Sequence, residues 1–341
     1  MALNVSTGTP GASAPGAGAF PAHHKFYEKT FLEALQPLEI YDKFGSKATI
    51  PQNESNTIVV SKMAELATLE SSPLTEGTTP TEQTLSMTRT EASFNQFGGY
   101  LRTTDRLSEE GVNNATFEFT KRIGWQGGRT MNLVSRDGLL GGTNVRYTGG
   151  AANQDAITSS GVVAADFNFM WNAFKQVHVR TMTPGSAGSQ NLGTLPVAPA
   201  FWVTVPFEAR AFLETLDDSN GNTWKNVEDY QGQVTTMPNE LGRYREFRFI
   251  GDTESSIVSN GAGTPQDIAQ CLVFGQGEQD KAYKIVDLAG GNMKHITKPL
   301  GSSGSLDPLD QRASIGWKAK GGTFIVQDLY MFRFEFSIGN T

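Results

Sequence analysis

The sequence predicts an α+β protein in which strands and long loops outweigh helices. The composition is rich in glycine, and its polar residues are mostly uncharged Thr, Ser, Asn and Gln, a balance that favours β-structure over helical bundles. The stretch from Gly45 to Tyr100 has an extended character and contains almost no core. Two later segments, residues 104–137 and 167–177, carry apolar residues at helical spacing instead.

Size and charge limit the classes of protein that fit. The 341 residues correspond to about two domains. The net charge is -7, and no window gathers five or six Lys and Arg, so no basic face for reading nucleic acid is predicted.

No targeting or membrane segment is predicted. The chain has no run of 18 apolar residues, which excludes a transmembrane helix. The N-terminus lacks the basic and apolar regions of a secretory signal, so we expect the protein to stay in the cytosol where it is made. Residues 1–22 are mostly Ala, Gly, Ser, Thr and Pro and predict an extended arm that cannot bury a core by itself.

A short helix is predicted after this arm, over residues 25–38. Tyr27, Phe31 and Leu35 fall on one face of this segment, and Pro37 places its end near Gln36. The next feature is a long β-hairpin: the apolar patch 57–63 and the alternating segment 85–90 flank a polar excursion bracketed by Pro and Gly. Because an isolated two-stranded hairpin is marginal in water, we expect this arm to lie on a neighbouring subunit.

One long helix is predicted from Thr104 to about Asp137. Its apolar stripe is interrupted by glycines such as Gly124, Gly127 and Gly128, which predict either breaks or a close approach of a neighbouring backbone. Glycines 138, 141 and 142 are assigned to the following loop. A second helix is predicted over residues 167–177. Strands are predicted at 201–205, 244–250, 269–274, 282–288, 313–318 and 323–338, the last two around the Gly321-Gly322 turn.

The sequence predicts no catalytic, cofactor-binding or metal site. Gly124-Trp125-Gln126-Gly127-Gly128-Arg129-Thr130 only loosely resembles a phosphate-binding loop, and a helix interrupted by glycines is favoured. The segment Asp217–Asn222 is rich in oxygen ligands but lacks the spacing of a calcium loop, so a turn is favoured. The four histidines show no metal-binding spacing, and Cys271 is interpreted as a small buried hydrophobe.

The order of the elements resembles the major capsid (coat) protein of tailed bacteriophages, the Hong Kong ninety-seven type fold. The likeness runs from about Lys25 to Phe336, and it depends on the order and spacing of motifs that are weak one by one. These motifs are Leu74-Thr75-Glu76-Gly77-Thr78-Thr79-Pro80, Gln96-Phe97-Gly98-Gly99-Tyr100 with Thr104-Asp105, Val273-Phe274-Gly275, Gly301-Ser302-Ser303-Gly304 with Asp307-Pro308-Leu309, and Gly316-Trp317-Lys318.

The resemblance implies a domain organisation and a set of partners. The hairpin corresponds to the E-loop, which with the N-terminal arm reaches onto neighbouring subunits, and the long helix is the spine helix. The implied parts are an N-terminal arm (1–24), a short helix and connector (25–44), the E-loop (45–103), a peripheral domain (104–160 and 301–341) and an axial domain (161–300). Pentamers and hexamers of the chain would enclose double-stranded DNA without sequence-specific binding, with scaffolding, portal and decoration proteins as possible partners.

Seven residues are predicted to make inter-subunit contacts. They are Lys62, Glu70, Glu76, Glu82, Arg89, Arg102 and Arg106. The alternative interpretation of these charged residues is a solvated surface. Two alternative functions also stay open: an encapsulin-like compartment on the same fold, which would package a cargo enzyme, and a β-rich enzyme or carbohydrate-binding module.

Overall fold

The structure is a computed structural model of the whole chain. It describes residues 31, 40–50, 57–64, 66, 69, 73–106, 115–157, 161–184, 197–218, 221–230, 236–260, 265–277, 280–288, 293–302 and 308–339. The chain divides into two compact units: residues 1–38, 96–130 and 293–319 form the first, and residues 39–95, 131–292 and 320–341 form the second. Among the described residues, no helix is both long and apolar enough to span a membrane.

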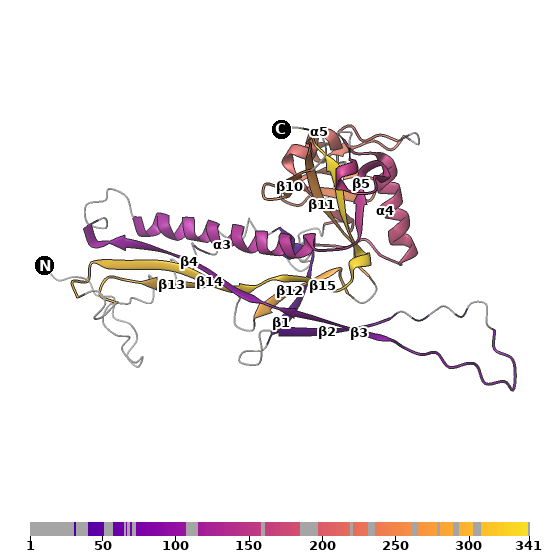
Figure 1. Ribbon diagram of the computed structural model, residues 1–341, viewed down its shortest axis with the longest axis horizontal. Coiled ribbons are helices and arrows are strands. Elements are labelled where there is room, and N and C mark those ends of the chain that lie inside the picture. The colour runs from indigo at the N-terminus through magenta and orange to yellow at the C-terminus, as the bar shows by residue number, and fades with distance from the viewer. Residues whose placement is uncertain are drawn as a thin grey trace. The chain divides into compact units, whose positions relative to one another are not determined.

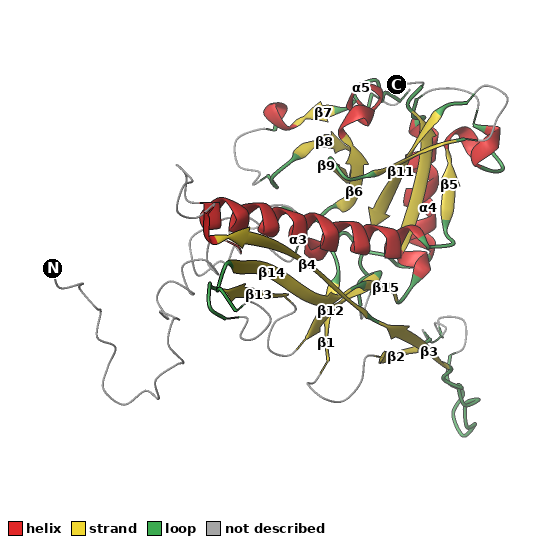
Figure 2. Cartoon of the chain, turned by 60° about the vertical axis from the view of Figure 1, so that its left-hand side comes forward, coloured by secondary structure: helices red, strands yellow, loops and turns green. Residues whose placement is uncertain are grey.

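The first unit consists of a helix on a three-stranded sheet. The helix is the first part of α3 (Ala115–Leu140), and the sheet has the order β13 (Met293–Lys298), β14 (Arg312–Gly321) and β4 (Asn95–Thr104). Figures 1 and 2 both show α3 lying along this sheet. The indole N–H of Trp317 donates to Gln126 Oε1 at 3.2 Å, which ties β14 to the helix.

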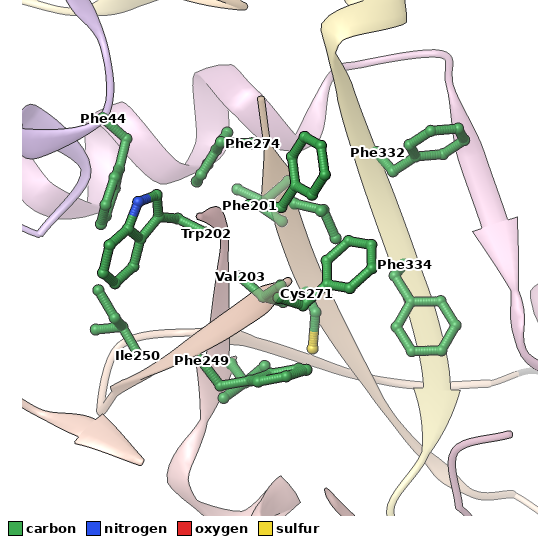
Figure 3. Close-up of a cluster of buried hydrophobic side chains, with 14 of the residues drawn as sticks. Phe44, Phe201, Trp202, Val203, Phe249, Ile250, Cys271, Phe274, Phe332 and Phe334 are labelled. Carbon is green, nitrogen blue, oxygen red and sulfur yellow. The ribbon is translucent and has the colours of Figure 1, made fainter. Parts of the chain in front are cut away.

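An eight-stranded sheet dominates the second unit. Its order is β5 (Val145–Tyr147), β16 (Met331–Ser337), β11 (Asp267–Phe274), β6 (Phe201–Pro206), β9 (Phe247–Asp252), β8 (Glu240–Tyr244) and β7 (Lys225–Asn226), with β10 (Ser256–Ser259) also paired to β11. The helices α4 (Ala164–Gln176) and α5 (Arg210–Leu213) belong to the same unit. Aromatic side chains fill its core, as Figure 3 shows for Phe201, Trp202 and Phe334.

Two smaller sheets complete this second unit. One has the order β1 (Ser46–Ile50), β12 (Tyr283–Leu288) and β15 (Thr323–Ile325), and the other is the hairpin of β2 (Thr57–Met63) and β3 (Met87–Ser93). Short 3-10 helices lie between the strands and helices of the second unit. They are η2 (Tyr41–Lys43), η3 (Thr148–Gly150), η4 (Gln154–Ala156), η6 (Phe207–Ala209), η7 (Val227–Asp229) and η9 (Asp328–Tyr330).

The glycines of the long helix do not break it, and Gly138 marks a close contact. From Ala115 the described helix is continuous through Gly124, Gly127 and Gly128 to Leu140, so Gly138 belongs to the helix and its assignment to a loop was wrong. A Cβ atom on Gly138 would lie 2.8 Å from Thr323 Oγ1 and 3.0 Å from the Thr323 carbonyl oxygen. Residues 107–114, in the first part of the predicted helix, lie outside the described residues.

Two predicted strands each turned out to be two separate elements. The segment 244–250 is divided between β8 and β9, because Arg245 turns the chain with a φ of 52°. The segment 323–338 is divided between β15, which pairs with β12, and β16, which pairs with β11 and β5. The eight-stranded sheet therefore takes β5 and β16 from ranges assigned to the peripheral domain, while its other strands come from the axial range.

The predicted hairpin range also contains strands of other sheets. In the described part of residues 45–103, β2 and β3 pair with each other, whereas β1 pairs with β12 and β4 lies beside β14. Of the predicted helix 25–38, the structure describes only Phe31, which is helical, buried and in contact with the His295 ring at 5.2 Å.

Candidate assembly surfaces

The hairpin continues far beyond its paired strands. The strands β2 and β3 are antiparallel, with Thr57 opposite Ser93 and Met63 opposite Met87. Beyond them the chain runs out and returns as an extended loop (Figure 1). The described tip turns at Thr75–Thr78, where the Thr78 N–H donates to the Thr75 carbonyl and Gly77 has a φ of 77°. This left-handed conformation explains why glycine occupies the turn.

The base of the hairpin is packed within its own unit. Ile58, Val60 and Ala92 lie against a small buried cluster of Ile50, Phe94, Val286 and Phe324. Farther out, large apolar side chains are exposed, and Leu74 at the tip reaches 79% exposure. The others are Val59, Met63, Leu66, Leu69, Leu85 and Met87. An exposed apolar set of this size on an arm without a core indicates a surface that another molecule covers.

All charged residues of the hairpin tip are acidic. Residues 64–86 contain Glu65, Glu70, Glu76 and Glu82 and have no Lys, Arg or His. Glu76 and Glu82 are exposed in the structure, whereas Glu70 lies outside the described residues. The two predicted cations of the hairpin sit on its paired strands: Arg89 is exposed, and the Lys62 ammonium lies 5.3 Å from the centre of the Tyr330 ring.

A groove follows the three-stranded sheet of the first unit. Its volume is about 740 Å³, and residues of β4, β13 and β14 line it. Ile296 is opposite Gly316 in the β13–β14 register, and a Cβ atom on Gly316 would lie 3.0 Å from the Tyr100 Cβ atom. These contacts place Tyr100, Gly316 and Ile296 on one face of the sheet. Trp317, the next residue, points to the other face and contacts α3.

The face that carries the groove is basic. Arg102, Lys298, Arg312 and Lys318 line the groove, and none of its described lining residues is acidic. Lys294 is opposite Lys318 in the same register and adds to this face. We call this surface, Arg102 with Lys294, Lys298, Arg312 and Lys318 around Tyr100 and Ile296, the basic sheet face.

Only one of these cations was among the predicted contact residues. Arg102 lies on the basic sheet face, where its guanidinium is 5.5 Å from the centre of the Tyr100 ring. Arg106 is exposed just beyond β4, and its N–H donates to Asp105 Oδ1. The other four cations come from two segments some 200 residues later in the chain. Their only signal in the sequence was an even spacing within each segment, as for Lys294 and Lys298, which puts both cations on one face of a strand.

The described residues contain no group of three or more His, Cys, Asp and Glu side chains arranged to hold a metal ion. Asp218, in the oxygen-rich turn, instead accepts hydrogen bonds from the Asn222 backbone and side chain and pairs with Arg245. Cys271 is fully buried in β11, and burial raises the pKa of its thiol. These contacts account for the polar motifs as structural features.

Comparison with known proteins supports the fold at low sequence identity. The sequence matches no protein-family model and no curated protein. The capsid of Ralstonia phage GP4 is similar with a TM-score of 0.64 and 11% identity, over 99% of this chain and 98% of that chain. The head structure of Helicobacter pylori bacteriophage KHP40 gives a TM-score of 0.58 and 11% identity, over 85% and 86% of the two chains. The chain has the fold of tailed-phage capsid proteins.

A third similar structure is a virus-like particle from Pyrococcus furiosus, with a TM-score of 0.52 and 10% identity over 92% of this chain and 99% of that chain. The capsid fold therefore extends over nearly the whole chain, and the predicted fold class is confirmed. Among the described residues, the exposed hairpin and the basic sheet face are therefore two candidate assembly surfaces.

Proposed function

We propose that this protein is the structural subunit of an icosahedral phage capsid that encloses double-stranded DNA. The observation that carries the proposal is the capsid fold, which covers 99% of this chain and 98% of the Ralstonia phage GP4 chain. The chain would form pentamers and hexamers in the cytoplasm of a bacterial host, and scaffolding, portal and decoration proteins are candidate partners. The role is structural and not catalytic.

The domain assignment follows the same proposal. The peripheral domain would contain the long helix and the C-terminal strands (104–160 and 301–341), and the axial domain would contain residues 161–300. The strands β5 and β16 would then link the two domains, because they pair within the eight-stranded sheet. The alternatives, a cargo compartment and a β-rich enzyme or binding module, have no specific observation in their favour.

The hairpin is the proposed contact arm between subunits. Its tip carries four glutamates without a cation, and the basic sheet face carries five cations without an acid among the described groove residues. Opposite charges on two surfaces guide association and fix its register. We infer that the tip of one subunit lies in the groove of a neighbour, where Leu74 would contact Tyr100 and Ile296.

This arrangement gives each predicted contact residue a proposed role. Glu70, Glu76 and Glu82 would face the cations of the neighbour, among them Arg102, and Arg106 would extend the positive charge beyond β4. Arg89 and Lys62, on the paired strands, would contact the neighbour closer to the base of the hairpin. Because such contacts are repeated at every position of a closed shell, weak individual pairs are sufficient.

Electron microscopy of the purified chain, with light scattering on the same sample, tests the shell itself. Closed shells, tubes or rings of capsomers are expected. A monomer that stays monomeric even with a scaffolding partner from the same source would contradict the proposal.

A charge exchange tests the proposed contact. We expect Glu76→Lys with Glu82→Lys to raise the subunit concentration needed for assembly at least tenfold, because like charges would then meet in the groove. Arg102→Glu with Lys298→Glu should have the same effect, and the four substitutions together should restore assembly in part. The control, Glu228→Lys with Asp229→Lys, makes the same charge change at exposed residues elsewhere. If the four substitutions together do not restore assembly, this pairing of surfaces is refuted.

A further inference from the structure

The long helix exposes a basic and aromatic stripe on the side away from its sheet. Within the first unit, Ile123 and Gly127 are buried, and a Cβ atom on Gly127 would lie 3.4–3.5 Å from Met293 and Trp317. Arg122, Trp125 and Arg129 are exposed at a spacing of i, i+3 and i+7, which places them on one side of the helix. We call these three residues the helix stripe.

The helix stripe combines a large exposed ring with positive charge. Trp125 is 51% exposed, although an indole gains much free energy from burial. Arg122 precedes it by three residues and Arg129 follows it by four, so a guanidinium lies on each side of the ring along the helix. Lys121 adds a further cation, and Glu118, 3.9 Å from the Lys121 ammonium, is the acidic residue of the first turn of α3.

This positive charge stands out in an acidic chain. The whole sequence has a net charge of -7, whereas the described segment 118–129 carries three cations and one acid. The helix stripe also lies on the opposite side of its unit from the basic sheet face, because α3 covers the inner face of the sheet and the groove follows the outer one. A neighbour's hairpin in the groove would therefore leave the helix stripe uncovered.

We propose that the helix stripe binds the phosphodiester backbone of the enclosed nucleic acid without reading its sequence; this rests on the proposed function. Arginine guanidinium groups pair with phosphate oxygens through two parallel hydrogen bonds. At 1.5 Å per residue, Arg122 and Arg129 lie about 10 Å apart along the helix, which spans about three phosphates of one strand. The Trp125 indole supplies an N–H donor and an apolar face for sugars or unstacked bases.

The chemistry favours a polyanion over an acidic protein segment. The side chains of the helix stripe project from a convex helix, which suits a regular row of phosphates and offers no groove of its own to a peptide. A single contact of this kind is weak, and a shell repeats it in every subunit around one continuous polymer. The contact would hold DNA against the wall without trapping it.

Titration of a labelled 20-base-pair duplex with unassembled full-length subunits, followed by fluorescence anisotropy at several salt concentrations, tests the proposal. Removing two phosphate contacts with Arg122→Gln and Arg129→Gln should lower the slope of log K against log salt by about 1.8, since each contact contributes about 0.9. The loss in affinity should be at least tenfold at low salt. Trp125→Ala should weaken binding without changing the slope, because it removes no charge.

The matched control is Arg210→Gln with Lys225→Gln, which removes the same charge from exposed residues of the second unit. It should leave both affinity and slope near the values of the unmodified chain. Arg122→Lys with Arg129→Lys should keep the slope but bind less tightly, because lysine lacks the paired donors of a guanidinium.

The outcomes separate this proposal from the proposed function. Shells that form normally, together with a slope lowered only by the Arg122 and Arg129 variant, would support the helix stripe as the DNA contact. Equal slopes for that variant and the control would overturn it, and so would equal competition by polyglutamate of matched charge, which would assign the stripe to an acidic protein. Failure of the unmodified chain to form shells would count against the proposed function alone.

Discussion

The surroundings of Asp252 disfavour the charged form of its carboxyl group. It ends β9 with 2% of its surface exposed, and the Glu254 N–H donates to its Oδ1 at 3.0 Å. Burial raises the pKa of Asp252 above its usual value of 3.8, and the Glu254 N–H and the nearby polar side chains of Tyr41 and Asn132 oppose this shift only in part. The carboxyl therefore holds its proton more tightly in the folded chain than in the unfolded one.

The direction of this pKa shift predicts a pH-dependent gain from Asp252→Asn. At neutral pH the ionised carboxylate lowers the free energy of unfolding. This loss shrinks as the pH falls through the raised pKa of the folded chain, and it is gone below 3.8, where the carboxyl is protonated in both states. The amide still accepts the Glu254 hydrogen bond and carries no charge. We expect Tm of unassembled subunits to rise by roughly 2–4 °C at pH 7.5, with a smaller gain at pH 4.

Thermal unfolding followed by circular dichroism at both pH values measures this difference. Asp229→Asn, at an exposed position, is the control for loss of one negative charge. A gain for Asp252→Asn that is equal at both pH values would show that burial of the charge is not its cause.

At the scale of the element, two glycines of α3 should respond in opposite ways to alanine. A Cβ atom on Gly127 would make ordinary contacts at 3.4–3.5 Å, so Gly127→Ala should stabilise the chain by about 0.5–1 kcal/mol through helix propensity. On Gly138 the same atom would lie 2.8 Å from Thr323 Oγ1 and 3.0 Å from the Thr323 backbone oxygen. Gly138→Ala should therefore destabilise the chain by about 1–3 kcal/mol.

Urea unfolding of the two single variants tests this pair, because each serves as the other's control for the gain in helix propensity. Equal and favourable changes at both positions would mean that Thr323 moves aside without cost. In that case, close packing would not be the reason for glycine at position 138.

The same helix shows which features could be predicted from the sequence and which could not. Its apolar stripe predicted a long helix, and the glycines left open whether the helix was broken or closely packed. The structure shows no break at Gly124, Gly127 or Gly128. The helix also includes Gly138, which was assigned to a loop, and the residue that packs against Gly138 is Thr323, some 185 residues later in the chain. The segment 323–338 presents a similar limit: its alternation predicts extended backbone, but β15 and β16 join different sheets, and local periodicity carries no information about the partner strand.

Surface charge follows the same rule at the scale of the whole molecule. No window of the sequence gathers five or six cations, because the five cations of the basic sheet face come from three strands, and the first lies about 190 residues before the others. The acidic hairpin tip, in contrast, is one continuous segment, and three of its glutamates, Glu70, Glu76 and Glu82, were among the predicted contact residues. Surfaces made by one segment can be predicted from composition, and surfaces made by a sheet need its topology.

The hairpin should separate the folding of the subunit from the assembly of the shell. Replacing residues 65–85 with Asn-Gly would join Ala64 to Ser86, which are already hydrogen-bonded, through a two-residue turn that suits antiparallel strands. The base of the hairpin keeps its contacts with Ile50, Phe94, Val286 and Phe324, so Tm of the subunit should change by less than about 2 °C. Shells should be absent in electron micrographs, because both the acidic tip and its exposed apolar side chains are lost.

A control with Thr78→Ser and Thr79→Ser keeps the length and charge of the tip and should assemble normally. Normal shells from the shortened chain would show that the subunits are held together without the tip, and an equal loss of Tm and assembly would show that the tip acts through folding.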